Sequence, residues 1–243
     1  MAKTVVALLV GIALEEGAIA SLDAPASLYL PEWADDARAA ITLRHLLEMA
    51  SGLGAAEHDE DPFSDVGYMY LGTDSRYVVS HAALEHAPGT VHVYNSVNTQ
   101  ALAFALEAAT GVPYAEYLSS KLWMPLGAGD AAVWLDGEDG AAKAFCCLFA
   151  TARDWARVGL LFQDGGRVGG RRVVPEPWIA QMMTPSALEP DYGWHLWVGA
   201  RGARAGDCEE PFVADHPALA GTPSTSSPAV HAEREELGRA VAL

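Results

Sequence analysis

Two residues of this sequence could carry proton-transfer chemistry if the fold brings them together. Lys3 directly precedes a strongly apolar segment, and Tyr94 stands between a short alternating run and a long apolar-periodic segment. Burial disfavours the charged form of a lysine, so a desolvated amine at a helix start can act as a base. A neighbouring tyrosine can share or relay the proton. The alternatives are structural: a solvated amine for Lys3 and a packed ring in a capped turn for Tyr94.

Residues 88–111 place Tyr94 between a turn and a helix. Pro88-Gly89 is typical of a turn, and Gly111 is a helix stop. Apolar residues recur between them at three- and four-residue spacing, which predicts a helix; they are Ala101, Leu102, Ala105, Leu106 and Ala109. Ser96 is expected to cap this helix and not to serve as a nucleophile.

Residues 4–14 must position Lys3. Their apolar side chains fit one broad helix face, and Gly17 suits a helix stop. The same stretch partly fits a secretory signal peptide, although Glu15 and Glu16 are atypical of a cleavage region. The apolar run is too short to span a bilayer. The sequence assigns no cellular compartment.

The remaining elements are expected to be short. Further helices are predicted at 43–51, 75–86, 114–122, 151–163 and 177–183, with Thr42 and Thr151 as N-caps. Strands are predicted at 132–135, 144–149, 171–174 and 193–198. Residues 54–72 are expected to form a surface loop that could line a cleft. The end of the chain, from residue 231, is compatible with a short helix.

Composition excludes several classes of function. The net charge is −17, so the surface repels nucleic-acid phosphates and anionic membranes. A 51% share of apolar residues indicates a globular protein. Cys146 and Cys147 are adjacent, and adjacent cysteines rarely satisfy the geometry of a disulfide. They are expected to be small buried apolar side chains. No histidine or cysteine spacing predicts a metal site.

Five segments then occur in a characteristic order: AKTVVALLVGIALEEGAIASLDAPASLYLPEW, ITLRHLLEMASGL, PGTVHVYNSVNTQALAFALEAATG, YLSSKLWMPLG and ATARDWARVGLLFQDGG. Together, across residues 2–198, they resemble the serine β-lactamase and penicillin-binding-protein superfamily. The resemblance is to the class C β-lactamase-related branch, which includes esterases, D-aminopeptidases and 6-aminohexanoate-dimer hydrolases. Tyr94-Asn95-Ser96 is most similar to the last group, since class C lactamases have asparagine at the position of Ser96.

The resemblance implies an α+β fold of the β-lactamase/transpeptidase type, helix-rich and with an antiparallel sheet. Residues 1–198 would form the hydrolase domain, with its helical region at about 35–170. Residues 199–243 diverge from the pattern and are expected to be irregular. The sheet is therefore expected to be incomplete, and exposed apolar helix faces would favour self-association.

The resemblance also implies a reaction and a set of site residues. Lys3 would be the general base of a serine acyl-enzyme mechanism, and Tyr94 would assist proton transfer. Tyr70, Asn95, Trp134 and Gly221 are the candidate substrate-binding residues, although Tyr70 and Trp134 could equally be packing residues. The substrate would be a small amide or ester, and the resemblance implies no metal and no organic cofactor.

The chain departs from the family at both ends. In the family the nucleophilic serine lies three residues before the lysine, and here that position falls one residue before Met1. After Gly221 the apolar strands that the family has are not apparent. The chain as written is therefore expected to be truncated and inactive. The alternative is a non-catalytic fragment or pseudoenzyme with a binding role.

Overall fold

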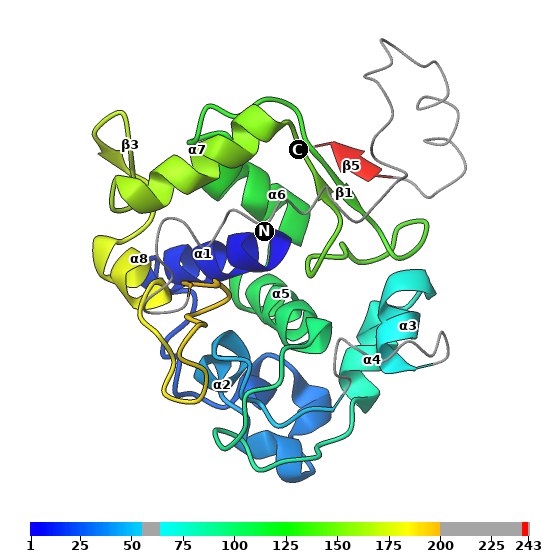
Figure 1. The fold of residues 1–243 in the computed structure, drawn as a ribbon. Helices are drawn as coiled ribbons and strands as arrows, with labels where there is room; N and C mark the ends of the chain where they lie inside the picture. The colour runs from blue at the N-terminus through cyan, green and yellow to red at the C-terminus, as the bar shows by residue number, and fades with distance from the viewer. Residues whose placement is uncertain (55–63, 200–239, 243) are drawn as a thin grey trace, which may run out of the picture.

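The computed structural model describes residues 1–54 and 64–199, and the backbone of residues 240–242. Helices predominate, and a small antiparallel sheet lies to one side of them (Figure 1), so the fold is α+β as predicted. No helix in the described part of the chain is long and apolar enough to cross a lipid bilayer.

Two helices form the centre of the molecule. Helix α1 (Ala2–Glu15) packs lengthwise against α5 (Ser96–Thr110), as Figure 1 shows. Residues 5–10 of α1 are fully buried, so this helix is surrounded by protein on all sides. Gly17 and Gly111 follow the two helices with positive φ angles of 77° and 69°. Both predicted helix stops are confirmed, and α1 is a core helix of this fold.

Shorter helices surround this pair. They are α2 (Leu43–Leu47), α3 (Asp65–Leu71), α4 (Ser75–His81), α6 (Tyr114–Leu118), α7 (Ala152–Gln163) and α8 (Glu176–Met182). Three 3-10 turns, η1 (Ala26–Leu28), η2 (Pro31–Trp33) and η3 (Ala37–Ala40), and a π turn, η4 (Ser119–Trp123), complete the helical part. The hydroxyls of Thr42 and Thr151 accept from the backbone N–H of the third residue of α2 and α7, which confirms both predicted N-caps.

The sheet is small and has an unexpected member. Strand β1 (Ala132–Trp134) lies between β2 (Leu148–Phe149) and β5 (Ala240–Ala242), and both pairings are antiparallel. A separate hairpin joins β3 (Arg167–Val168) to β4 (Arg171–Arg172). The prediction of a helical chain end is therefore wrong for β5. The backbone of residues 240–242 pairs with β1, about 100 residues earlier in the chain, and local periodicity cannot predict a pairing over that separation.

Two other predictions are wrong for local reasons. Residues 193–198 do not form a strand, because the chain turns back on itself there: Gly193 N–H donates to the Leu196 carbonyl at 2.8 Å, and Tyr192 bridges to Trp197. The alternating apolar residues of 193–198 therefore lie on the two arms of a turn and not along one strand. Residues 65–71 form helix α3 and not a loop, since the Ser64 hydroxyl caps the segment by accepting from the N–H of Gly67.

Candidate active site

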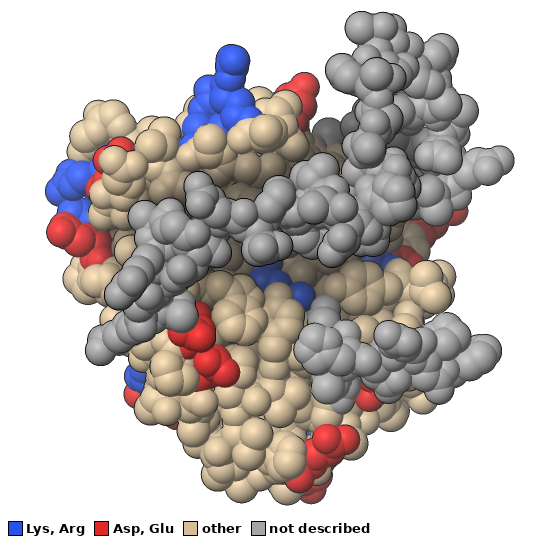
Figure 2. Space-filling view, viewed as in Figure 1, with Lys and Arg blue, Asp and Glu red and all other residues tan. Residues whose placement is uncertain are grey.

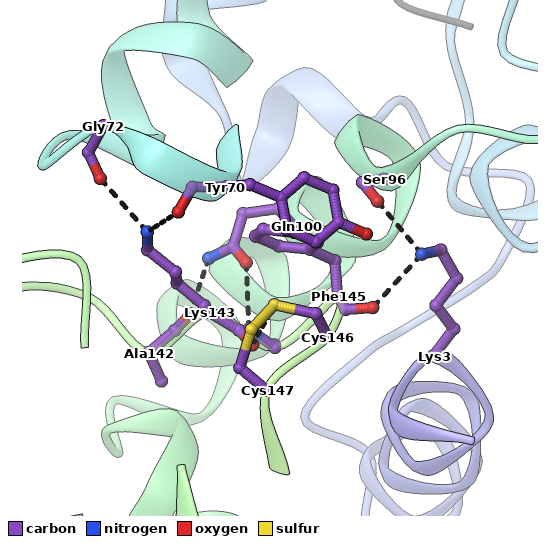
Figure 3. Close-up of a disulfide and its surroundings, with 11 residues drawn as sticks. Lys3, Tyr70, Gly72, Ser96, Gln100, Ala142, Lys143, Phe145, Cys146 and Cys147 are labelled. Atoms are coloured by element: carbon purple, nitrogen blue, oxygen red, sulfur yellow. Dashed lines mark hydrogen bonds between the residues drawn. A yellow bond between two sulfur atoms is a disulfide. The ribbon is translucent and has the colours of Figure 1, made fainter. Parts of the chain in front are cut away.

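Lys3 lies in the first turn of α1 and its side chain is directed into the protein. The residue is only 8% exposed. Its Nζ donates to the Ser96 hydroxyl at 3.0 Å and to the Phe145 carbonyl at 3.2 Å (Figure 3). The solvated-amine alternative is therefore wrong. The buried body of α1 holds the amine in place, because the first turn cannot move without disturbing the packed helix behind it.

Tyr94 lies beside this amine, as the sequence predicts. Lys3 Nζ is 5.1 Å from the centroid of the Tyr94 ring, a distance at which the ring face attracts an ammonium group. Two further aromatic rings pack against Tyr94: Tyr192 at 5.9 Å and Trp197 at 5.7 Å between centroids. Burial raises the pKa of Tyr192, which keeps that neighbouring phenol neutral.

Asn95, and not Ser96, caps helix α5. Its backbone is extended, with φ −148° and ψ 153°, and its Oδ1 accepts from the N–H of Asn98 at 2.9 Å. Ser96 is already the first helical residue, so its hydroxyl is turned towards Lys3 and the predicted cap is wrong. Asn95 is fully buried, and its amide donates to the carbonyls of Leu53 and Gly54. It therefore organises the fold beside the site, and the substrate-binding role predicted for it stays a prediction.

The second acceptor of Lys3 comes from residues 142–147, here called the cysteine loop. Gln100 of α5 holds the start of this loop, since its amide donates to the Ala142 carbonyl at 2.9 Å and accepts from Ala144 N–H at 3.0 Å. Lys143 is buried and donates to the Tyr70 and Gly72 carbonyls, and burial lowers its pKa. These contacts fix the direction from which the Phe145 carbonyl reaches Lys3.

Tyr70 contributes a wall to the same region. Its ring meets the Phe145 ring edge to face at 5.1 Å, and the residue is 40% exposed, so it lies at the edge of this region. Trp134 instead lies in β1, where it packs against Phe149 at 5.1 Å as part of the sheet. Gly221 lies outside the described residues.

The adjacent cysteines are joined. Cys146 and Cys147 form a disulfide directly after Phe145, with both sulfur atoms on the same side of the loop (Figure 3). Both residues are only half-buried. The prediction of two buried apolar thiols is therefore wrong, because the loop turns both side chains the same way.

His195 is a residue of this region that sequence reasoning missed. It is fully buried, and burial lowers its pKa to about 3. The neutral ring donates from Nδ1 to the Leu47 carbonyl at 3.0 Å and accepts at Nε2 from the Thr99 hydroxyl at 3.0 Å. Its own carbonyl accepts from Thr4 at 2.8 Å. His195 thus ties α1, α2 and α5 together next to Lys3, through contacts too distant in sequence to leave a local signal.

Charge is distributed without a basic patch on the face shown in Figure 2. Acidic side chains lie there in several separate groups, and neutral side chains make up most of the described surface. Among the described residues no group of three or more His, Cys, Asp or Glu side chains could hold a metal ion. What the described geometry provides is a buried amine, a hydroxyl, a phenol and an aromatic wall.

Comparison with known proteins identifies the family. A sequence model described as Beta-lactamase matches residues 1–204. The chain belongs to the β-lactamase family. The 6-aminohexanoate-dimer hydrolase of Paenarthrobacter ureafaciens is 31% identical over 200 residues, which cover 78% of this chain and 50% of that protein. The chain thus spans about half the length of this curated relative.

Solved structures agree on the fold. A Bacillus anthracis protein named for 6-aminohexanoate-dimer hydrolase superimposes with a TM-score of 0.71 at 23% identity, covering 80% of this chain and 56% of that one. A D-stereospecific amidohydrolase from Streptomyces gives a TM-score of 0.62 at 20% identity, covering 80% and 68%. The predicted β-lactamase/transpeptidase-like α+β fold and the 6-aminohexanoate-dimer-hydrolase-like branch are confirmed. The chain is a member of a hydrolase family.

Proposed function

We propose that this chain carries the base and the proton relay of an acyl-enzyme site for small amides or esters. The observation that supports the proposal is the placement of Lys3 Nζ, buried and 5.1 Å from the Tyr94 ring. A free amine there would take the proton of an attacking serine hydroxyl as its oxygen bonds to the substrate carbonyl. The Tyr94 hydroxyl would pass a proton to the leaving amine or alcohol. Water would then release the acid.

The position of the nucleophile is the one that the family resemblance implies, and helix geometry supports it. A serine directly before Met1 would lie three residues before Lys3. Residues three apart on a helix are neighbours on one face, with about 5–6 Å between their Cβ atoms. Because α1 begins at Ala2, continuing the helix through Met1 to the added residue would bring such a hydroxyl alongside Lys3. The amine of Lys3 is then within reach of both the nucleophile and Tyr94.

A fluorophosphonate probe tests this proposal. Three proteins are compared: the 243-residue chain, the same chain with serine added directly before Met1, and a matched control with alanine added there. Only the serine form should be labelled, at the added residue. Lys3→Met in that form should slow labelling by about 10²–10⁴-fold, the usual effect of losing a general base. A folded serine form that stays unlabelled, or labelling that maps to Ser96, would overturn the proposal.

The alternative function is binding without catalysis. It is favoured by the aromatic rings of Tyr94, Tyr192 and Trp197, which form a cluster beside Lys3. Such a cluster can hold an amide or ester without cleaving it. Under this alternative none of the three proteins is labelled, yet a non-hydrolysable amide perturbs the tryptophan fluorescence of the unmodified chain.

A further inference from the structure

We propose that Cys146 and Cys147 are a reversible dithiol–disulfide centre that controls how the Phe145 carbonyl meets Lys3. The centre itself is independent of the catalytic proposal, whereas its effect on catalysis rests on the function proposed above. The sulfur atoms are already joined in the structure, and the carbonyl of the preceding residue is a hydrogen-bond acceptor of the Lys3 amine (Figure 3).

The disulfide lies near the surface. Cys146 and Cys147 are both half-buried, so part of this pair reaches solvent and we expect a small reductant to approach it. By contrast, Phe145 is almost fully buried, at 2% exposed, and so is Lys3 at 8%. The centre therefore lies at the boundary between solvent and the buried amine. It can react with a solute that the amine itself does not meet.

The Phe145 carbonyl is held from two sides. On the preceding side, Gln100 accepts from the Ala144 N–H and donates to the Ala142 carbonyl. On the following side, the loop is tied to the sheet, because Trp134 N–H donates to the Cys147 carbonyl at 3.1 Å. Between these two attachments, the disulfide closes a small ring that contains the Cys146–Cys147 peptide.

Opening that ring frees the backbone next to the carbonyl. The Phe145 carbonyl belongs to the peptide plane shared with Cys146, so rotation about the N–Cα bond of Cys146 is coupled to its tilt. The closed ring contains the Cα–C bond of Cys146 and the N–Cα bond of Cys147, and it restricts rotation about both. Reduction restores these rotations and their conformational entropy, which lets the Cα atom of Cys146, and with it the attached peptide plane, move relative to Cys147. The hydrogen bond from Lys3 to the carbonyl should then weaken, while the bond to Ser96, on helix α5, should remain.

The reaction is an ordinary thiol–disulfide exchange with a dithiol. One thiolate of the dithiol attacks a sulfur atom of the pair and forms a mixed disulfide. The second thiolate of the dithiol then displaces the remaining cysteine sulfur. Cys146 and Cys147 gain two electrons and two protons, and the dithiol becomes a cyclic disulfide. Oxidised dithiol drives the reverse reaction.

Mass spectrometry tests the centre itself. The Cys208→Ser variant is used so that Cys146 and Cys147 are its only thiols, and dithiothreitol is the dithiol. The folded, air-equilibrated protein should take up no maleimide, and the reduced protein should take up two. Additional replacement of Cys146 by serine is the matched control, which should take up one maleimide in both conditions. Two adducts on the unreduced folded protein would overturn the proposal.

Nuclear magnetic resonance tests the coupling to Lys3. The chain has three lysines, so ¹³Cε-lysine labelling gives three signals, assigned through Lys121→Arg and Lys143→Arg. Reduction should move the Lys3 signal by more than its line width and leave that of Lys121 in place. The double variant Cys146→Ser/Cys147→Ser should show no response to dithiothreitol. Unchanged Lys3 signals, in a protein whose near-ultraviolet circular dichroism is retained, would overturn the coupling.

Labelling kinetics separate this inference from the catalytic proposal. In the chain with serine added before Met1, the fluorophosphonate reaction should be about tenfold slower in the reduced state, the typical effect of one lost hydrogen bond. Equal rates in the two states would overturn the control of catalysis. If the Lys3 signal moves but neither state is labelled, the redox centre is supported and the acyl-enzyme proposal fails.

Discussion

The two walls around Lys3 are built in different ways. Helices α1 and α5 supply Lys3 and Ser96 from the centre of the protein, where residues 5–10 are fully buried. The cysteine loop supplies the Phe145 carbonyl and leads into β2, a two-residue strand whose Phe149 is 44% exposed. The amine is thus fixed by the packing of two long helices, whereas its carbonyl acceptor is fixed by loop hydrogen bonds and by the buried Phe145 ring. We therefore expect the Lys3 amine to be held more rigidly than the Phe145 carbonyl that faces it.

The largest expected effect is a difference in the free energy of unfolding between substitutions in helix α1 and in strand β2. Leu8→Ala should lower the free energy of unfolding by about 2–5 kcal/mol, because it leaves a cavity in the centre of the core. Phe149→Ala should cost only about 1 kcal/mol or less, because the ring is partly exposed and packs mainly on Trp134. Urea unfolding followed by circular dichroism measures both. Equal losses would show that the two walls are equally rigid.

The next largest effect is expected at Gly11, where helix α1 packs closely against Trp178. A Cβ on Gly11 would meet the Trp178 ring, which also donates from Nε1 to the Ala7 carbonyl. Gly11→Ala should therefore cost about 1–3 kcal/mol through overpacking. Gly159→Ala on α7 is the matched control, since a Cβ there meets nothing within 4 Å. It should stabilise by about 0.5–1 kcal/mol. A tolerated Gly11→Ala, seen in the same urea series, would mean that α1 is more loosely packed.

Acid should lower the stability of the protein through His195, which joins α1, α2 and α5. Its pKa is about 3 in the folded protein because of burial, against about 6.5 for a free histidine. Between these values the unfolded chain binds a proton that the folded chain does not, so stability falls as the pH drops below 6.5. His195 changes the free energy of unfolding by at most about 1.4 kcal/mol per pH unit, and its stabilising contribution is fully present above pH 6.5.

The matched comparison for this slope is His195→Gln. Burial also lowers the pKa values of His45 and His92, which therefore add to the slope of the unmodified protein in the same direction. The difference in slope between variant and parent isolates His195. Denaturant titrations at several pH values would provide it, and identical slopes would contradict the neutral, buried imidazole.

The smallest effect concerns the start of α5. Asn95→Ala removes the cap of this helix and should cost about 1 kcal/mol, with somewhat more for the unpaired carbonyls of Leu53 and Gly54. Asn95→Ser keeps a capping oxygen without burying a charge and is the control. A thermal shift assay compares the two variants. If alanine and serine behave alike, the cap contributes nothing to the stability of α5.

The helical wall was largely predictable and the loop wall was not. Periodicity and stop signals predicted the helices before Gly17 and Gly111, because both signals act within a few residues. The prediction of Ser96 as the cap is wrong because Asn95 and Ser96 both have side chains that can cap a helix. Only the backbone angles decide which of the two is the N-cap. Residues 193–198 resemble a strand because aromatic alternation also fits a turn that closes on itself.

The contacts that build the site span the chain. Lys3 and the Phe145 carbonyl are 142 residues apart, and no local pattern joins them. The prediction for the cysteine pair is wrong for the same reason, since the direction of its side chains is set by a loop held by Gln100. The pairing of Lys3 with Tyr94 was predicted through the resemblance of ordered segments, and the structure places these residues side by side. Their catalytic roles stay a proposal.

The hydrogen bond between Lys3 and Ser96 joins the first turns of two long helices. Each helix presents the positive end of its dipole there, so the site is locally positive in a protein whose net charge is −17. A carboxylate product of the proposed reaction would therefore be attracted over a few ångströms and repelled by the remainder of the molecule. At physiological salt the repulsion extends only about 8 Å, so added salt should slow the escape of an acid once it has left the helix ends.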